Sequence, residues 1–343
     1  MSERVRRRRV LGYGAAALAL GLGIAAQELV VRLAVPEFDP SRQVHYTDKV
    51  GDTPILAAPG LHRQAKNTGD YNVVVRINRH GFRDGRDIAE ATGDDWIVVG
   101  DSYAFGWGVE ARDRTSEQLE KRLGGPRVFN IAMTGNFDDY GQLLRHAARL
   151  GATVRNVAVM VTMENDLGLY GPAAPGQQAA SSESDWNFLL FKNWLMAHSE
   201  LYYLATSMVH HTEALRDLAV RAGMVRANLD GVHKAEENAE VPLRSANRLA
   251  EVLRDYPQSR AVIIPSRALW AGSAEDRATA DRVHRAFVAA LAAHGVRVID
   301  MRPDFEAGGA PLSFHFAHDG HWNPRGHALA AERLACSIRS CPP

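Results

Sequence analysis

Cysteine is nearly absent from this sequence, since the 343 residues include only Cys336 and Cys341, close together near the C-terminus. Two cysteines cannot form a zinc site by themselves. Outside the cytoplasm the pair could close a disulfide that ties down the end of the chain, and the alternative is two free thiols. No other pattern indicates a cofactor, so none is expected.

An excess of charge of either sign is also missing, because 40 Lys and Arg residues balance 40 Asp and Glu residues. The global basic field that favours nucleic-acid binding is therefore lacking, and no nucleic-acid partner is expected. Internal repeats and long low-complexity tracts do not occur. The composition is that of an ordinary globular protein, which excludes a disordered or fibrous chain.

Long hydrophobic runs are limited to VLGYGAAALALGLGIAA at residues 10–26, which follows five arginines within residues 1–9. A run of about 17 apolar or small residues is at the short end of a membrane span. The arginines are expected to stay cytoplasmic and to send the rest of the chain across the inner membrane into the periplasm. We therefore predict a transmembrane helix or signal anchor over residues 1–30. The alternative is a cleaved signal and a secreted protein, because small residues lie near the end of the run.

Beyond residue 93, short apolar runs alternate with amphipathic helical patterns. This alternation predicts a three-layer α/β/α sandwich with a central parallel sheet over residues 93–343. Ligands bind such sheets beyond the carboxyl ends of the strands. The expected strands are 96–100, 127–133, 154–166, 261–266 and 296–301, and the expected helices are 114–123, 138–151, 278–295 and 325–338.

Two other segments precede or interrupt this domain. Residues 31–92 are expected to form a membrane-proximal extension, in which YNVVVRIN at 71–78 alternates in part, as a strand does. Residues 167–250 are expected to form a helical insertion. Its aromatic-rich part at 185–211 suits a lid over the site, a surface that leans on the membrane, or a helix packed on the core, and 212–250 suits a charged surface helix.

The stretch IVVGDSYAFGWG at 97–108 ends a buried strand in Gly-Asp-Ser, which presents Ser102. A serine hydroxyl is a weak nucleophile that needs a base, and the base needs a partner that orients it. The segment HDGHWNPRGH at 318–327 offers both, with His321 as the base and Asp319 as its partner.

An oxyanion that develops during attack by serine needs hydrogen-bond donors already in place. Three donors are available beside predicted strand ends. They are the backbone N–H of Ser102, the backbone N–H of Gly135, which no side chain obstructs, and the side-chain amide of Asn165. We therefore predict that these groups form an oxyanion hole.

These residues make the chain similar to the SGNH hydrolase superfamily, also called the GDSL esterase/lipase family. That family has four sequence blocks, which contribute Ser, Gly, Asn and His. The resemblance spans about residues 94–336, apart from the insertion, and the final block resembles that of membrane-anchored bacterial members. The matching blocks are GDS at 100–102, NIA at 130–132 leading to Gly135, ND at 165–166, and HWNPRGH at 321–327.

Two positions depart from the family's pattern. Met163 stands where the third block usually has glycine. The family commonly places the acid three residues before the histidine, where this chain has His318, so the resemblance to an Asp-x-His branch assigns that role to Asp319. His318 and His327 are the alternative bases.

The resemblance implies hydrolysis or transfer of acyl esters by Ser102, with His321 and Asp319 moving the proton. Asp101 is expected to brace its own turn, and Arg83 to brace the turn that carries Ser102. A metal site among the clustered histidines is not expected, because no carboxylate or cysteine pattern beyond Asp319 supports one.

The substrate expected first is a glycan of the envelope or a secreted polysaccharide that carries O-acyl groups, most simply O-acetyl. Exposed aromatics around the site would suit stacking on sugars, and the candidates are Phe105, Trp107, Phe137, Tyr140 and Trp322. The first alternative is a lipase or lysophospholipase-like enzyme with 185–211 as an apolar lid. The second is a non-catalytic module that binds a glycan or a membrane partner, for which Met163 and the shifted acid are the only support.

Overall fold

The computed structural model describes residues 3–35, 43–47, 53–66, 68–167, 170, 194–195, 198–221 and 238–341. The chain forms two compact units, and each is described by itself. One unit comprises Met1–Gln43, Asn67–Gly69 and Ala180–Ala227, and the other comprises Val44–Lys66, Asp70–Ala179 and Asn228–Pro343.

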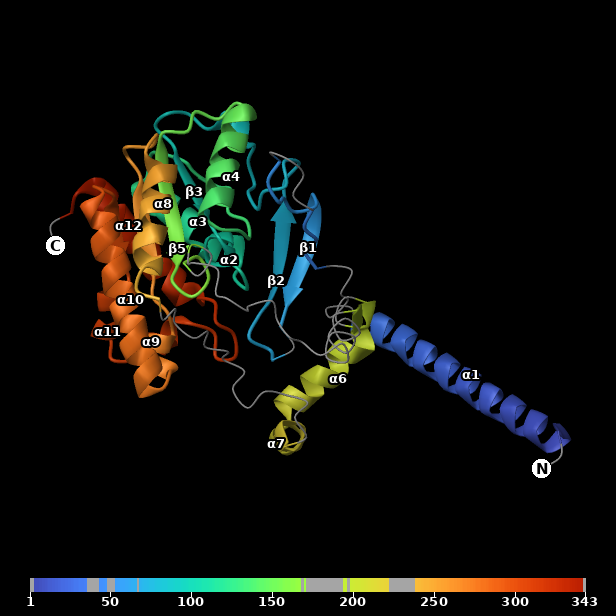
Figure 1. Cartoon of the computed structure of the whole chain (residues 1–343). Coiled ribbons are helices and arrows are strands. Elements are labelled where there is room, and N and C mark those ends of the chain that lie inside the picture. Colours follow the sequence, from blue (N-terminus) through green and yellow to red (C-terminus); the bar gives the residue numbers. More distant parts are fainter. Residues whose placement is uncertain are drawn as a thin grey trace. The chain divides into compact units, whose positions relative to one another are not determined.

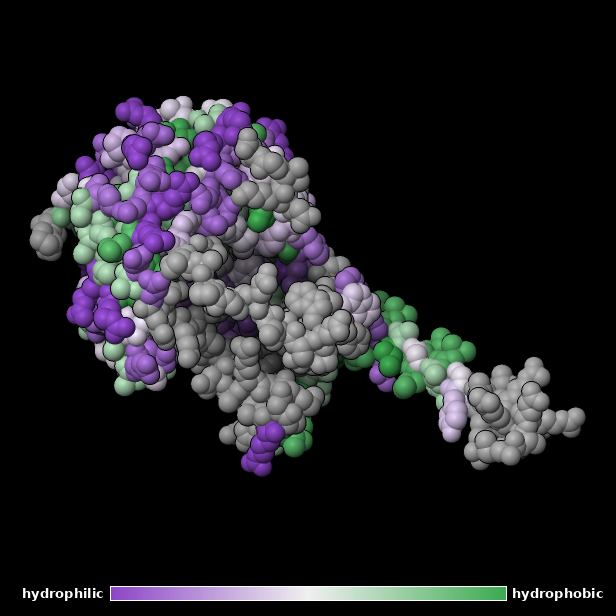
Figure 2. Space-filling view, in the orientation of Figure 1, coloured by the Kyte–Doolittle hydropathy of each residue, from purple (hydrophilic) through white to green (hydrophobic). Residues whose placement is uncertain are grey.

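The first unit contains a long N-terminal helix, α1 (Glu3–Ala34). Its part Gly12–Ala34 has 23 residues, a mean hydropathy of 1.7, and only 6% of its most apolar window is buried. Figure 2 shows the apolar side chains along this helix. The apolar segment continues beyond the predicted end at Ala26. By length and composition it can cross a membrane, as a membrane anchor or a signal sequence does.

Helix α6 (Glu200–His211) begins against the C-terminal part of α1, and α7 (Glu213–Arg221) follows it. The Glu28 carboxylate accepts hydrogen bonds from the Ser199 hydroxyl at 2.8 Å and from the N–H groups of Glu200 and Leu201 at 2.8 and 3.1 Å. A carboxylate there satisfies N–H groups that have no partner within the helix. Residues 185–193 and 196–197 of the predicted helical stretch 185–211, and residues 222–237 of the predicted surface helix 212–250, lie outside the described residues.

The second unit is built on a five-stranded parallel sheet, in agreement with the predicted α/β/α fold (Figure 1). The strand order is β4-β3-β5-β6-β7. Every residue of β3, with the sequence WIVVG, is buried, as expected for a strand covered on both faces. The strands are β3 (Trp96–Gly100), β4 (Val128–Asn130), β5 (Asn156–Thr162), β6 (Arg260–Ile264) and β7 (Arg297–Asp300).

The chain reverses its direction across the sheet after β4, because β5 pairs with the other side of β3. Right-handed crossovers then place the helix before β4 on one face and the helix after it on the other. Helix α3 packs with α12, and α8 packs with both α4 and α10. These helices are α3 (Thr115–Leu123), α4 (Phe137–Arg149), α8 (Val241–Leu253), α10 (Ala274–Ala293) and α12 (Pro324–Arg339).

Several predicted boundaries were too wide. Strand β5 ends at Thr162, and residues 163–166 form a turn that leaves the sheet. The predicted charged surface helix at 212–250 was wrong in its last part, because α8 buries an apolar face that includes Val241, Leu249 and Leu253. Among its described residues, the unit also contains the short helices α2 (Ser102–Phe105), α9 (Ala268–Ala271) and α11 (Arg302–Ala307), and 3₁₀ turns at Ile88–Glu90, Ala111–Asp113 and Pro311–Phe314.

A separate two-stranded antiparallel hairpin precedes the sheet. It consists of β1 (Gly60–Ala65) and β2 (Asn72–Ile77), paired from Gly60 with Ile77 to Ala65 with Asn72. Residues of β2 alternate between exposed and buried positions, which confirms the partial alternation in the sequence. The register brings the end of β1 and the start of β2 together at one end of the hairpin.

Gly100 makes the exit from β3 possible. Its φ of +152° lies where side chains are rarely tolerated, and an added Cβ would lie 2.6 Å from the Met160 carbonyl oxygen and 2.8 Å from the Ala104 Cβ. Only glycine therefore lets the strand turn directly into the helix that carries Ser102.

We predict that Gly100→Ala lowers stability by roughly 3 kcal/mol, because it combines backbone strain with overpacking against β5. Thermal unfolding followed by circular dichroism should show a Tm lower by roughly 6 °C. Gly125→Ala, where an added Cβ meets nothing within 4 Å, serves as the control and should unfold with the parent. Equal Tm values for the two variants would contradict the prediction.

Candidate active site

The candidate side chains gather at the carboxyl ends of neighbouring strands. Ser102 opens α2 directly after β3, Gly135 precedes α4 after β4, and Asn165 lies in the turn after β5. The reversal of strand order makes this edge a topological switch point, which is where open α/β sheets bind their ligands. Asp101 caps α2 by accepting a hydrogen bond from the Tyr103 N–H at 3.0 Å, which confirms that it braces its own turn.

Ser102, His321 and Asp319 form a continuous hydrogen-bonded line. The Ser102 Oγ lies 2.9 Å from Nε2 of His321, and Nδ1 of His321 contacts Oδ1 of Asp319. An ionised carboxylate only accepts hydrogen bonds, so Nδ1 carries the proton and Nε2 is left to accept from the serine hydroxyl. This tautomer is the one in which imidazole can take a proton from serine.

Asp319 is buried, and burial alone raises the pKa of its carboxyl. The hydrogen bond and charge of His321 and the charge of Lys66 outweigh burial and hold that pKa well below its usual range. Asp319 is therefore ionised at neutral pH. Its charge favours the imidazolium form of His321 that proton transfer produces.

Two aromatic rings confine the His321 imidazole. Trp107 is stacked on it, with 5.8 Å between ring centroids and 25° between the ring planes, and the Tyr103 ring lies 5.1 Å away. Trp107 is partly exposed, while Tyr103 is buried. The stack fixes the plane of the imidazole and leaves one aromatic face at the edge of the site.

Three hydrogen-bond donors lie at the same edge of the sheet as the Ser102 hydroxyl group. In the part of the chain that the structure describes, the N–H groups of Ser102 and Gly135 donate no hydrogen bond. Asn165 is exposed, and its Nδ2 donates to Oδ2 of Asp101 at 3.4 Å, which leaves its second amide hydrogen available. A Cβ on Gly135 would lie 2.6 Å from the Asp139 Cβ, so glycine is needed there.

A buried acid, Asp166, holds the turn that carries Asn165. Its carboxyl accepts hydrogen bonds from the Thr162 N–H at 2.9 Å and the Tyr140 hydroxyl at 3.0 Å. Burial, reinforced by the nearby charge of Asp101, raises the pKa of Asp166 well above its ordinary value. Asp166 thus keeps its proton at a pH where an exposed carboxyl has lost it.

Arg83 holds the other end of α2, which confirms the expected bracing role. Its guanidinium donates to the carbonyl oxygens of Phe105 at 3.1 Å, Gly106 at 2.5 Å and Val109 at 2.6 Å. Burial and the neighbouring Arg114 lower the pKa of Arg83 to about 9. The arginine therefore ties the last residue of α2 to the turn that follows it.

A buried ion pair supports the loop that carries His321. The Glu164 carboxylate accepts from the Arg267 backbone N–H at 2.6 Å and lies 3.4 Å from its Nη2. A Cβ on Gly320 would lie 2.6 Å from that Nη2, so the guanidinium is packed directly against the loop. The pair links the turn after β5 to the loop before α12.

The other histidines do not contact Ser102. His327 is buried against Thr115, with Nδ1 2.9 Å from its Oγ1, and His315 is buried too. Burial lowers the pKa of each to about 3, so both are neutral. His318 lies beside Asp70, with Nδ1 3.4 Å from its carboxylate. Within the described ranges, no group of three or more His, Cys, Asp or Glu residues could hold a metal ion.

The prediction of exposed aromatics around the site was wrong for all but Trp107. The others point into the core because α2, α4 and the final loop each turn their apolar side inward. Phe137, for example, is stacked between Tyr170 and Phe287, with centroid distances of 5.2 and 6.4 Å. The buried residues, each at most 1% exposed, are Phe105, Phe137, Tyr140 and Trp322.

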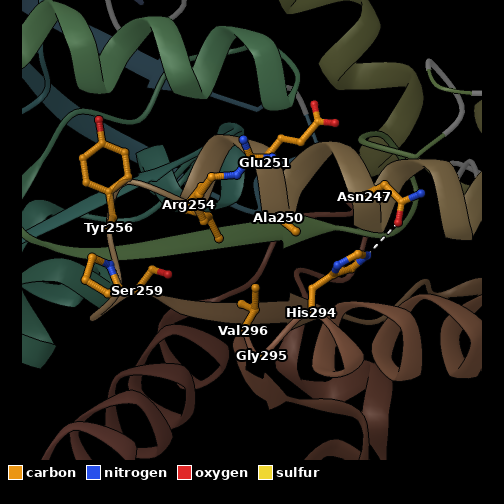
Figure 3. A pocket seen from close by; sticks show the side chains of 11 residues that line it. Asn247, Ala250, Glu251, Arg254, Tyr256, Ser259, His294, Gly295 and Val296 are labelled. Atoms are coloured by element: carbon orange, nitrogen blue, oxygen red, sulfur yellow. Dashed lines mark hydrogen bonds between the residues drawn. The ribbon is translucent and has the colours of Figure 1, made fainter.

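A cavity of about 570 Å³ lies at the opposite end of the sheet, and Figure 3 shows its lining. Ser259 and Val296, which line it, directly precede β6 and β7, so the cavity is at the amino ends of these strands. His294 contacts Asn247 there at 2.6 Å. The cavity is therefore separate from the Ser102 site.

Cys336 and Cys341 are both free thiols in the structure, which therefore has no disulfide between them. The Cys341 N–H donates to the Cys336 carbonyl at 3.0 Å and closes the end of α12. A hydrogen bond between the two side chains raises the pKa of the Cys336 thiol.

Four residues of the site were missed by sequence reasoning: Lys66, Tyr71, Glu164 and Arg267. Glu164 lies between Met163 and Asn165 in the third block, so its position there was a usable signal. Lys66 and Tyr71 belong to a hairpin that no motif marks, and Arg267 follows an ordinary buried strand. Only the tertiary structure brings these three to the site.

The fold and this array define an α/β protein with a Ser–His–Asp line at the carboxyl edge of a parallel sheet, as in ester hydrolases. The family model of the GDSL-like Lipase/Acylhydrolase family matches residues 98–329. The chain therefore belongs to the GDSL-like lipase/acylhydrolase family, as its four sequence blocks predicted. A search of curated protein sequences gives no match.

Several solved structures are similar to this chain at low identity. A member of the lipolytic protein G-D-S-L family from Veillonella parvula is 14% identical, with 72% of this chain and 99% of that one covered and a TM-score of 0.40. A lipase/acylhydrolase from Enterococcus faecalis is 10% identical, with 72% and 96% covered and a TM-score of 0.42. The acetylxylan esterase Axe2 from Geobacillus stearothermophilus is 14% identical, with 74% and 96% covered and a TM-score of 0.38.

We predict that Asp166→Asn makes the protein more stable at pH 8 and leaves stability near pH 4 unchanged. An amide can accept from Thr162 and donate to Tyr140, so the contacts survive. Above about pH 4 the unfolded chain releases the Asp166 proton while the folded chain keeps it, so the parent loses stability as pH rises. The amide variant lacks this loss.

The measurement is Tm as a function of pH from 4 to 8 for parent and variant. Asp94→Asn, at an exposed position, is the control and should follow the parent at every pH. A curve for Asp166→Asn that runs parallel to that of the parent would show that this carboxyl is ionised in the folded protein.

Proposed function

We propose that this protein is a serine esterase in which Ser102 is the nucleophile, His321 the general base and Asp319 the group that orients His321. The observation that carries the proposal is the 2.9 Å contact between Ser102 Oγ and His321 Nε2, in line with the buried, ionised Asp319. A serine whose proton has an acceptor within hydrogen-bond distance is activated for attack on an ester carbonyl.

The reaction proceeds in two halves. Ser102 attacks the ester carbonyl while its proton moves to Nε2 of His321, and the N–H groups of Ser102 and Gly135 with the Asn165 amide hold the oxyanion. His321 returns the proton to the leaving alcohol, and an acyl-enzyme remains. Water, or a second alcohol in a transferase, then attacks the acyl group with His321 again taking the proton.

A short acyl group, such as acetyl, on a glycan is the substrate that the site favours. A long acyl chain needs an apolar cleft. Among the described residues, none of the large hydrophobic side chains that are well exposed lies in the loops after β3, β4 and β5 or in residues 315–323. The partly exposed Trp107 beside His321 supplies one aromatic face for a sugar ring.

The N-terminal helix supports an enzyme that works at the outer side of the inner membrane. The span of 23 residues is longer than the apolar part of a secretion signal, which has about 7 to 15 residues, so we favour a retained anchor. The five arginines that precede it favour a cytoplasmic N-terminus and a periplasmic domain.

We predict that the full chain, solubilised in detergent, reacts once with a fluorophosphonate probe. Ser102 Oγ bonds to phosphorus, fluoride leaves, and His321 takes the proton. Intact mass should show one adduct on the parent and none on Ser102→Ala, and His321→Ala should label far more slowly. Asn165→Ala should label about 100-fold more slowly, because it lacks one oxyanion donor. A folded parent without an adduct would leave the non-catalytic module as the explanation.

We also predict that the enzyme prefers acetyl esters to longer acyl esters. The measurement is kcat/KM for 4-nitrophenyl esters from acetate to decanoate, together with acetate release from an O-acetylated polysaccharide. Values that rise with chain length would favour the lipase-like alternative. The Ser102→Ala variant gives the background rate for each ester.

A further inference from the structure

The hairpin of β1 and β2 lies outside the four sequence blocks of the family, but residues at its end contact Asp319. We call the hydrogen-bonded chain of Ser102, His321 and Asp319 the reactive line. We propose that Lys66, together with Tyr71, is a positioning residue that holds the outer oxygen of Asp319 and thereby sets the strength with which His321 acts as a base. This inference rests on the proposed function. Both residues precede the family match, which begins at residue 98.

The two oxygens of Asp319 have different partners. Oδ1 accepts from His321, while Oδ2 lies 2.9 Å from the Lys66 ammonium and 3.2 Å from the Tyr71 hydroxyl. The Asp319 side chain is 6% exposed, so water contributes little to its solvation. Lys66 and Tyr71 therefore provide the polar contacts of the oxygen that faces away from His321.

The register of the hairpin presents these two residues together. Ala65 pairs with Asn72, so Lys66 and Tyr71 lie at the same end, and the Lys66 N–H donates to the Tyr71 carbonyl at 3.0 Å. The residue beside Tyr71 also binds the loop, since Asp70 accepts from the His318 N–H at 3.1 Å. The hairpin thus holds consecutive residues of the segment that leads to His321.

Tyr71 also connects Asp319 to the ring that is stacked on His321. Its hydroxyl accepts from Nε1 of Trp107 at 2.7 Å while it donates to Asp319. Trp107 is in turn stacked on the imidazole. Asp319, Tyr71, Trp107 and His321 therefore form a closed ring of contacts, which fixes the carboxylate and the imidazole relative to each other.

The positive charge of Lys66 changes the strength with which Asp319 attracts a protonated His321, and a neutral hydrogen-bond donor would not do this. An ammonium on Oδ2 offsets part of the carboxylate charge, so Asp319 attracts the imidazolium less strongly than an unpaired carboxylate does. Removing that charge should strengthen the attraction between Asp319 and the imidazolium. As the pH is lowered, activity that depends on neutral His321 should then be lost at a higher pH than in the parent.

Other charged and titratable groups also face His321 and Asp319, and all stay in place when Lys66 is changed. Asp101 and Tyr103 come from the start of α2, and the Glu164–Arg267 pair comes from the loops after β5 and β6. The remaining groups are His315, His318 with Asp70, and His327. A change in the pH profile of a Lys66 variant therefore reports the ammonium itself.

The test compares Lys66→Met with Lys66→Arg in the full chain. For 4-nitrophenyl acetate we expect Lys66→Met to lower kcat about tenfold at little change in KM, as loss of a partner behind a reacting group does. The acid limb of its kcat/KM profile should move to higher pH. Lys66→Arg keeps the charge and should restore the position of that limb. Tyr71→Phe should lower kcat without moving the limb.

The control is Arg63→Met, which removes another polar contact of the same hairpin, to Asn72 at 2.6 Å, away from Asp319. It should leave kcat and the pH profile unchanged. Titration with the fluorophosphonate probe gives the concentration of reactive sites. Dividing the rate by that concentration separates a lower kcat from a smaller amount of folded protein.

Two results would overturn the inference. In the first, the parent takes the probe, but Lys66→Met has the same kcat and the same acid limb of the kcat/KM profile as the parent. Lys66 would then only tie the hairpin to the loop, while the proposed function stands. A folded parent that takes no probe adduct would overturn the proposed function and this inference with it.

Discussion

The parallel alignment of β3 with β4 and β5 is the constraint on which the rest of the structure depends. Because these strands are buried on both faces, their polar residues lie at their end positions or beyond them. The parallel direction then brings Ser102, Gly135 and Asn165 to one edge of the sheet. The strand order also reverses at β3, so this edge is a topological switch point, which is where open α/β sheets bind their ligands.

The buried carboxyl groups at this edge differ in ionisation, and the structure gives the physical reason. Asp319 has a cation or a proton donor on each oxygen, and its pKa is lowered despite burial. Asp101 and Asp166 accept hydrogen bonds from neutral donors, and burial raises the pKa of both. The acid that must stabilise an imidazolium is ionised, while Asp166 keeps its proton and braces the turn of Asn165.

Residues outside the family domain also contact the hydrogen-bonded line of Ser102, His321 and Asp319. The hairpin contacts the loop before α12 through Lys66, Asp70 and Tyr71, which links a segment near residue 70 to one near residue 320. Members of a family can share their blocks and still differ in such supporting contacts. The contact here joins the extension that precedes the family match to the carboxylate of the reactive line.

The sequence by itself determined the sheet, the order of helices and strands, and the line from Ser102 to His321 and Asp319. The spacing of apolar residues is a local property of the sequence, and the four blocks are short and well marked. Only the tertiary structure decided which aromatics are exposed, because Phe105, Phe137 and Trp322 turn inward on elements whose packing partners are distant in sequence. It also decided the roles of Lys66, Tyr71 and Arg267, since a charge acts through distance and burial, and neither is visible until the chain has folded.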